Sequence, residues 1–250
     1  MEYEEIVVGH KRVFICEEHH HVLKFWQQFK DLQPYVLTLD YHTDLNLTYQ
    51  HELYSRDKQS NCANKEELTA YRSQLLREVS EGNFEAIKKL KHDEHVDTAV
   101  KSGIVKKVLV HANDSYMGRP SDVYSINGDE DYAGQLIINN PRNYQDPNLA
   151  INSKQLKDSF MLFDRCIPRN EWLGNFILDI DLDYFITTKA IKPKDSTFFK
   201  MLIKEALVIS IAKESHWIGV WQREHDALLT VDYLLEELFK LIESASEESY

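Results

Sequence analysis

Short apolar runs rich in β-branched residues alternate along the chain with segments that carry apolar residues at helical spacing. The apolar runs lie at residues 35–40, 105–112, 176–185 and 206–212. Strands that alternate with helices are typical of βαβ units, whose strands form a mostly parallel sheet. Because a chain of 250 residues with 43% hydrophobic residues can bury one sizeable core, we expect a single α/β domain over residues 1–243.

Three polar segments interrupt this alternation. Residues 48–65 predict a surface loop ahead of a helix. Residues 113–152 are rich in Asn, Asp, Gly, Pro and Tyr and exceed the length of an ordinary connection. We expect them to form a functional lid or binding excursion, or a mobile flap. After an amphipathic helix over about residues 224–243, residues 244–250 predict an acidic tail.

Charge and cysteine content exclude several classes of protein. A formal net charge of −12 argues against a nucleic-acid or anionic-membrane surface, since both need clustered Lys and Arg, and it favours a cationic substrate. The first residues lack a signal region, and no apolar run approaches the roughly 18 residues of a membrane span. Cys16, Cys62 and Cys166 are widely spread, which predicts neither a disulfide framework nor a thiolate zinc site. We therefore expect a cytoplasmic protein with no nucleic-acid or membrane partner.

The run at residues 35–40 ends in the pattern D-x-H-x-D, at Asp40, His42 and Asp44. If the strand stays extended, the three side chains share one face. Taken alone, the pattern fits two interpretations equally well. One is a chemical site, and the other is a solvated strand end whose Asp residues cap the next turn.

A second acidic strand favours the chemical site. The segment "FILDIDLDYF" places Asp179, Asp181 and Asp183 on one face, with apolar residues between them. Three like charges in a half-buried strand repel one another and are costly to desolvate, and the strand has no Lys or Arg to compensate. A bound metal ion is the economical explanation. Parallel strands present ligands at their carboxyl ends, and aligning the two strands by length sets Asp40 opposite Asp181 and His42 opposite Asp183.

A histidine triplet supplies further donors. His19, His20 and His21 lie where a predicted strand gives way to a predicted helix. A single His at such a junction is usually a cap or a surface residue, but beside two acidic strand ends a ligand is the better interpretation. Carboxylate and imidazole ligands without thiolate suit Mn²⁺, Fe²⁺ or Zn²⁺, and a set rich in oxygen favours Mn²⁺.

Together these motifs resemble the ureohydrolase superfamily, the arginases and agmatinases, which share a fold with metal-dependent deacetylases. The segments "EEHHHVL", "TLDYHTDL" and "LDIDLDYF" most resemble the small arginase-like peptide arginases. Those enzymes convert arginine side chains of ribosomally made precursor peptides to ornithine and release urea. The resemblance implies a three-layer α/β domain with helices on both faces of a mostly parallel sheet, and two divalent metal ions.

The resemblance also implies which residues bind the ions. One ion would be held by His19, Asp40, Asp44 and Asp181. The other would be held by Asp40, His42, Asp181 and Asp183.

Two of these assignments have alternatives. His19 is preferred to His20 because Glu18 precedes it, as an Asp precedes the corresponding His of arginases. Asp179 departs from the family pattern, which has Ser at that place. Asp179 would then either support a neighbouring ligand or, in a shifted register, replace Asp183 as a ligand beside Asp181.

The catalytic groups follow from the same resemblance. Arginases orient the guanidinium group with a Glu at the end of a late strand, and Glu214 is the residue in that position, although it could instead be a solvated loop residue. His51 is the positional match to the general acid, with a different loop spacing. His95 and His111 are the alternatives, and each His taken singly is more often structural.

We expect the substrate to be an arginine-containing precursor peptide. Motifs that bind the α-amino and α-carboxyl groups of free arginine are not identifiable in the sequence, and the Tyr-rich segment 116–144 could bind an extended basic peptide or simply pack against the domain. The alternatives are an amidinohydrolase or deacetylase acting on a small molecule in a closed pocket, and a non-catalytic arginase-like binding module. A two-metal phosphoesterase is disfavoured because no Arg or Lys lies near the motifs to hold a phosphate.

Overall fold

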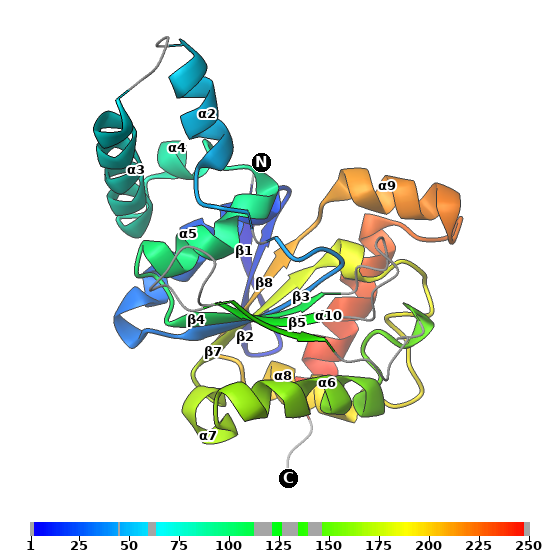
Figure 1. Cartoon of the computed structure of the whole chain (residues 1–250). Coiled ribbons are helices and arrows are strands. Elements are labelled where there is room, and N and C mark those ends of the chain that lie inside the picture. The colour runs from blue at the N-terminus through cyan, green and yellow to red at the C-terminus, as the bar shows by residue number, and fades with distance from the viewer. Residues whose placement is uncertain are drawn as a thin grey trace.

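The strands form one mixed sheet (Figure 1). The computed structural model describes residues 3–44, 46–59, 64–112, 122–126, 135–139 and 147–247. In these residues the sheet has eight strands in the order β1-β2-β8-β7-β3-β4-β5-β6. The strands are β1 (Tyr3–Val8), β2 (Lys11–Cys16), β3 (Tyr35–Asp40), β4 (Lys107–Ala112), β5 (Asp122–Ile126), β6 (Gln135–Asn139), β7 (Phe176–Asp181) and β8 (Val208–Ala212). The central strands β2, β8, β7, β3 and β4 are parallel, whereas β1, β5 and β6 are antiparallel to their neighbours.

Helices cover both faces of this sheet (Figure 1). The α-helices are α1 (Leu23–Trp26), α2 (Gln50–Gln59), α3 (Lys65–Ser80), α4 (Phe84–Ile87), α5 (His95–Lys101), α6 (Ser153–Cys166), α7 (Arg169–Trp172), α8 (Thr197–Glu205), α9 (Ser215–Glu224) and α10 (Val231–Glu247). Short 3-10 helices are η1 (His19–Val22), η2 (Gln27–Leu32), η3 (His92–Glu94), η4 (Pro147–Leu149) and η5 (Leu182–Tyr184). The prediction of an α/β chain with a mostly parallel sheet is confirmed, and the arrangement is consistent with a three-layer domain.

The central strands are mostly apolar because both of their faces are buried. Every residue of β3 and β7 is buried, as expected of parallel strands covered by helices on both sides. Leu37 and Leu39 of β3 pack in the core beneath α6, α8 and α10. Val36 packs in the core beneath α1, α3 and α5. A polar residue inside such a strand therefore needs a partner, and the next subsection starts from those residues.

The chain reverses its direction of travel across the sheet at β3 and β7. From β3 the chain continues outward to β4, and from β7 it continues the opposite way to β8. In open α/β sheets a ligand crevice forms beyond the carboxyl ends of the strands at such a point. Asp40 and Asp181 are the last residues of β3 and β7, so the two acidic motifs meet there as expected.

Several local predictions were wrong. The segment expected as a loop at 48–65 contains helix α2, a mostly polar helix with little apolar periodicity that is held to α3 by a 2.9 Å hydrogen bond from Tyr71 Oη to Glu52 Oε1. The last helix begins at Val231 rather than near residue 224, where α9 ends instead. It also continues to Glu247, so residues 244–247 are helical rather than part of a tail.

Strands β5 and β6 lie within the expected excursion at 113–152 and extend the sheet edge by antiparallel pairing. The stretches 113–121, 127–134 and 140–146 lie outside the described residues, and so do Tyr116 and Tyr144, the ends of the Tyr-rich segment. Across the part of the chain that the structure describes, no helix combines the length and the apolar character that a bilayer crossing requires.

Candidate metal centre

His19 is the centre of the site. It lies in η1, directly after the carboxyl end of β2, and its side chain is fully buried. Its Nδ1 atom is 3.3 Å from Asp40 Oδ2, 3.3 Å from Asp44 Oδ2 and 3.1 Å from Asp181 Oδ2. The structure thus brings together the four residues of the first predicted ligand set, around one nitrogen atom.

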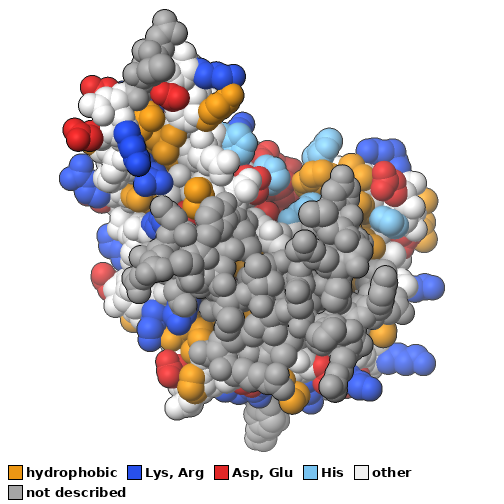
Figure 2. All heavy atoms as spheres, viewed as in Figure 1, with side chains coloured by type: hydrophobic (Ala, Val, Ile, Leu, Met, Phe, Trp, Pro, Cys, Tyr) orange, Lys and Arg blue, Asp and Glu red, His pale blue; other side chains and the backbone are white. Residues whose placement is uncertain are grey.

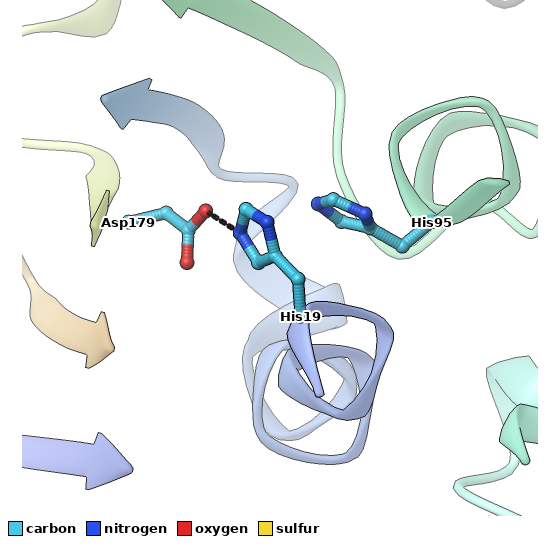
Figure 3. Close-up of side chains that lie close together, drawn as sticks. All are labelled: His19, His95 and Asp179. Atoms are coloured by element: carbon cyan, nitrogen blue, oxygen red, sulfur yellow. Dashed lines mark hydrogen bonds and ion pairs between the residues drawn. The ribbon is translucent and has the colours of Figure 1, made fainter. Parts of the chain in front are cut away.

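The opposite nitrogen of His19 is held by Asp179. His19 Nε2 lies 2.8 Å from Asp179 Oδ2 (Figure 3). The same carboxylate accepts hydrogen bonds from Thr38 Oγ1 at 2.7 Å and from Ser210 Oγ at 2.5 Å. Ser210 in turn accepts a hydrogen bond from Trp26 Nε1. A carboxylate that accepts from one imidazole nitrogen fixes the tautomer and directs the lone pair of the other nitrogen toward a metal ion.

This geometry distinguishes the two possible registers, in which either Asp183 or Asp179 is the ligand beside Asp181. His19, His95 and Asp179 also form a group whose ligand atoms lie within 4.8 Å of one another, but both oxygens of Asp179 already accept hydrogen bonds. Asp179 therefore lies behind His19 and supports it. Asp183, rather than Asp179, lies with the remaining carboxylates.

Residues of the second predicted ligand set also lie close together, next to the first set. His42 Nδ1 is 2.9 Å from Asp183 Oδ2 and 3.9 Å from Asp40 Oδ1. Asp40, His42 and Asp183 form a group that could hold a metal ion, and so do His19, Asp40 and Asp44. Asp40 belongs to both groups, as a bridging carboxylate would.

The sequence suggested that extended strands bring these side chains together, but the strands end too early for this. Strand β3 ends at Asp40 and β7 ends at Asp181. Each of these aspartates accepts a hydrogen bond from the backbone N–H two residues later, from His42 at 2.7 Å and from Asp183 at 2.9 Å. Asp and Asn side chains commonly form such turns. The two strand ends are thus built in the same way, and the turns rather than strand alternation position His42 and Asp183.

Buried polar atoms without a partner test whether a metal ion fits. Among the described residues, His19 Nδ1, Asp40 Oδ2 and Asp183 Oδ2 are buried and have no hydrogen-bond partner, although such groups are normally satisfied. With its proton on Nε2, His19 presents a lone pair to three carboxylate oxygens, which is repulsive unless a cation lies between them. Ligand atoms bound about 2.1 Å from one ion lie about 3 Å apart, which matches the separations around His19 Nδ1. The residues therefore fit a metal ion.

The pKa values of the clustered Asp and His side chains also indicate that positive charge would stabilise the cluster. Burial raises the pKa values of Asp40, Asp44 and Asp181, and neighbouring carboxylates raise them further. Burial alone would lower the pKa of His42, but the negative charge of the adjacent Asp183 carboxylate outweighs it and raises the pKa to about 9. A site that holds protons so firmly in the absence of a metal ion exchanges them for the ion when it binds.

Glu214 lies beside this cluster in a strained backbone conformation. It follows β8 and precedes α9, with φ at 39°, in the left-handed region that costs energy for a residue with a side chain. Its Oε1 atom accepts a 2.8 Å hydrogen bond from the backbone N–H of His19. Burial raises its pKa to about 7. The strand-end position predicted for Glu214 is confirmed, and it is a nearly buried group rather than a solvated loop residue.

The candidate general acids lie in different surroundings. His51, on α2, is half exposed, and its Nδ1 atom is 2.9 Å from Oε1 of the buried Glu94. His95 is fully buried with its ring centroid 4.1 Å from that of His19, and Nδ1 donates to the His92 carbonyl. Burial lowers the pKa of His95 well below its usual value. Of these two, only His51 combines a carboxylate partner with access to solvent.

The remaining candidate histidines belong to none of the groups of described residues that could hold a metal ion. His111 is buried on β4, with Nδ1 3.1 Å from Tyr184 Oη, and burial lowers its pKa to about 4. His20 is also buried, packs edge-on against His21 at 4.4 Å, and has its pKa lowered by burial to about 3. His19 was preferred to His20 as the metal ligand, and of the two only His19 belongs to the groups of described residues that could hold a metal ion.

Two groups of site residues were missed by sequence reasoning. Thr38 and Ser210 donate hydrogen bonds to Asp179. The sequence indicated them only as polar residues in mostly apolar strands. Trp217 lies on α9 with its ring centroid 5.2 Å from that of His42, and it was missed because α9 was not predicted. The spacing of four between Trp217 and Trp221 in "SHWIGVWQRE" was the available signal.

The site as a whole is a buried cluster of His and Asp groups that could hold a metal ion. It opens toward solvent near His42, whose side chain is 31% exposed. Figure 2 shows acidic and His side chains in a notch between the projecting α2–α3 arm and the lobe that carries α9. Comparisons of the chain with protein-family models, with curated proteins and with solved structures find no match.

Proposed function

We propose that the chain is a dinuclear-metal hydrolase that converts peptide-bound arginine to ornithine and releases urea. The observation that carries the proposal is a pair of ligand groups that share Asp40, with Asp181 beside them, at the carboxyl ends of the neighbouring parallel strands β3 and β7. His19, Asp40, Asp44 and Asp181 would hold one ion, and Asp40, His42, Asp181 and Asp183 would hold the other. The oxygen-rich set favours Mn²⁺.

Two bound ions would supply a water of lowered pKa, so that hydroxide is available near neutral pH. The chain's own residues would do the rest. Glu214 has one carboxylate oxygen on the backbone of His19, which leaves the other available to pair with a guanidinium group. His51, half exposed and oriented by Glu94 through Nδ1, would use its other ring nitrogen, Nε2, to protonate the departing amine.

A peptide substrate is supported by the open side of the site. His42 is partly exposed, and it lies at the solvent-facing side of the cluster, where Figure 2 shows a notch between the α2–α3 arm and α9. A small-molecule amidinohydrolase or deacetylase would be better served by a closed pocket. The net charge of −12 favours approach of a basic segment.

The test uses the full chain loaded with Mn²⁺ and four substrates: free arginine, agmatine, an arginine-containing peptide and an acetyl-lysine peptide. Loss of the elements CH₂N₂ from the arginine peptide, with release of urea, is the expected result by mass spectrometry. Preferred turnover of free arginine or agmatine would favour the small-molecule amidinohydrolase, and deacetylation would favour the deacetylase. No change in any substrate would refute hydrolysis and leave the binding module.

A matched pair of variants tests the ligand assignment. Asp181→Asn should abolish metal binding and turnover together, since it removes a carboxylate shared by both ions. Asp31→Asn, the same change at an exposed position of η2, should leave both unaltered. Full activity in Asp181→Asn would refute the assignment.

A further inference from the structure

An aromatic wall borders the open side of the metal centre. Trp217 lies in the first turn of α9 and contacts His42, the partly exposed member of the two ligand groups. Behind it, Trp221 is stacked at a centroid distance of 6.0 Å and an interplanar angle of 26°. Trp217 thus lies beside His42, at the edge of the proposed second metal position.

The wall is held rigidly from behind. Trp221 is buried, donates a 3.1 Å hydrogen bond from Nε1 to the Asp183 carbonyl, and packs against Tyr41 at 4.7 Å. The backbone N–H of Trp217 donates to the Glu214 carbonyl at 2.8 Å. Helix α9 is therefore anchored to the Asp183 backbone through Trp221, and the ring of Trp217 stacks on this buried indole.

Trp217 differs from the other tryptophans in being partly exposed. Trp26, Trp172 and Trp221 are buried, where a purely structural indole normally lies. Trp217 instead keeps accessible surface beside a carboxylate-rich site in an acidic protein. The face of an indole attracts a cation, and Trp is the strongest of the aromatic side chains in this respect.

We propose that Trp217 determines substrate specificity by packing against the cationic side chain of the substrate residue as it reaches the metal centre. The inference rests on the proposed function and adds a recognition element to it. Glu214 would bind the guanidinium group in the plane of that group, while Trp217 would cover its face. The two contacts together select a planar cation over a neutral side chain of the same shape.

The test compares Trp217→Leu and Trp217→Phe with the unaltered full chain, all loaded with Mn²⁺. Two peptides of the same sequence are used, one with arginine as substrate and one with citrulline, its neutral isostere, as competitive inhibitor. Trp217→Leu should raise KM for the arginine peptide about tenfold and change kcat by less than about twofold. Trp217→Phe should restore most of the loss, and the inhibition constant of the citrulline peptide should stay the same in all three proteins.

Controls separate recognition from structure. Leu228→Ala removes an exposed apolar side chain beyond the end of α9 and should leave KM unchanged. Metal content should be equal in every variant. An unchanged KM in Trp217→Leu, equal weakening of the arginine and citrulline peptides, or a fall in metal content and kcat without a change in KM would overturn the inference. If the unaltered protein turns over no arginine peptide, the proposed function itself fails and the inference falls with it.

Discussion

Asp179→Asn tests whether His19 binds a metal ion through Nδ1. Asp179 is fully buried and accepts three hydrogen bonds, from His19 Nε2, Thr38 Oγ1 and Ser210 Oγ. Asparagine has nearly the same shape but carries no charge, and one of its two terminal atoms can only donate. The variant therefore keeps the packing while it weakens the group that fixes the imidazole.

The expected magnitude follows from this arrangement. Loss of a carboxylate that orients a metal-bound His lowers metal affinity by about 10- to 100-fold, which is about 1.4 to 2.7 kcal/mol of binding free energy. The hydroxyl of Ser210 accepts from Trp26 Nε1 and donates to Asp179, so an asparagine amide on that side would leave its hydrogen without an acceptor. We therefore expect an additional loss of stability in the metal-free protein.

The assay is metal titration by calorimetry, with metal content checked by elemental analysis after dialysis. Circular dichroism confirms the fold, and Asp31→Asn is the matched control. Thermal unfolding gives a second measure, because a weaker metal site reduces the stabilisation that saturating metal provides. Unchanged affinity would refute the ligand role of His19 Nδ1. A loss as complete as in Asp181→Asn would show that Asp179 is itself a ligand.

Three further predictions concern other parts of the molecule. Because the pKa of His42 is raised to about 9, its pairing with Asp183 stabilises the metal-free protein fully below about pH 6.5, and this stabilisation is lost as the pH rises through 9. Metal affinity should rise over the same range, by about tenfold per pH unit for each proton released. Thermal unfolding of both forms at several pH values checks the two opposite trends, and parallel trends would contradict them. Glu214→Gln should lower kcat by at least about a hundredfold with metal content unchanged, since glutamine keeps the oxygen that accepts from the His19 backbone, and normal turnover would exclude Glu214 from catalysis. Gly9→Ala should lower the free energy of unfolding by about 1–3 kcal/mol, because Gly9 has φ at +60° and an added Cβ would lie 2.5 Å from Ser246 Oγ, whereas an unchanged urea midpoint would contradict this contact.

The strand ends were predictable because they obey a general rule. Apolar runs that finish in carboxylates were expected at the carboxyl edge of a parallel sheet, and Asp40 and Asp181 lie there. The positions of His42 and Asp183 depend on whether each strand continues or turns, and a short polar segment favours neither choice strongly. The backbone hydrogen bonds to Asp40 and Asp181 decide it in favour of a turn.

Helices α2, α9 and the end of α10 were not predicted for a different reason. Each is stabilised by contacts with residues far away in the sequence. Glu52 of α2 binds Tyr71 on α3, Trp221 of α9 binds the Asp183 backbone, and α10 ends against Gly9. Local propensity and periodicity contain none of these contacts.

The residues that support His19 could have been identified by aligning the strands in the sequence. Thr38 pairs with Asp179 across β3 and β7, and Asp179 pairs with Ser210 across β7 and β8. Each of the three lies two residues before the end of its strand, so the alignment by strand length that sets Asp40 opposite Asp181 also places them in one row.

Since residues two apart in a strand share a face, this row lies directly beneath the ligands on the side covered by α1 and α5. A polar row that crosses three strands buried on both faces costs stability unless its members satisfy one another. Here the row ends on an imidazole nitrogen and fixes the opposite nitrogen among three carboxylates. The candidate metal centre therefore accounts for the unusual composition of these strands, and the proposed ligands and their support form one continuous structure.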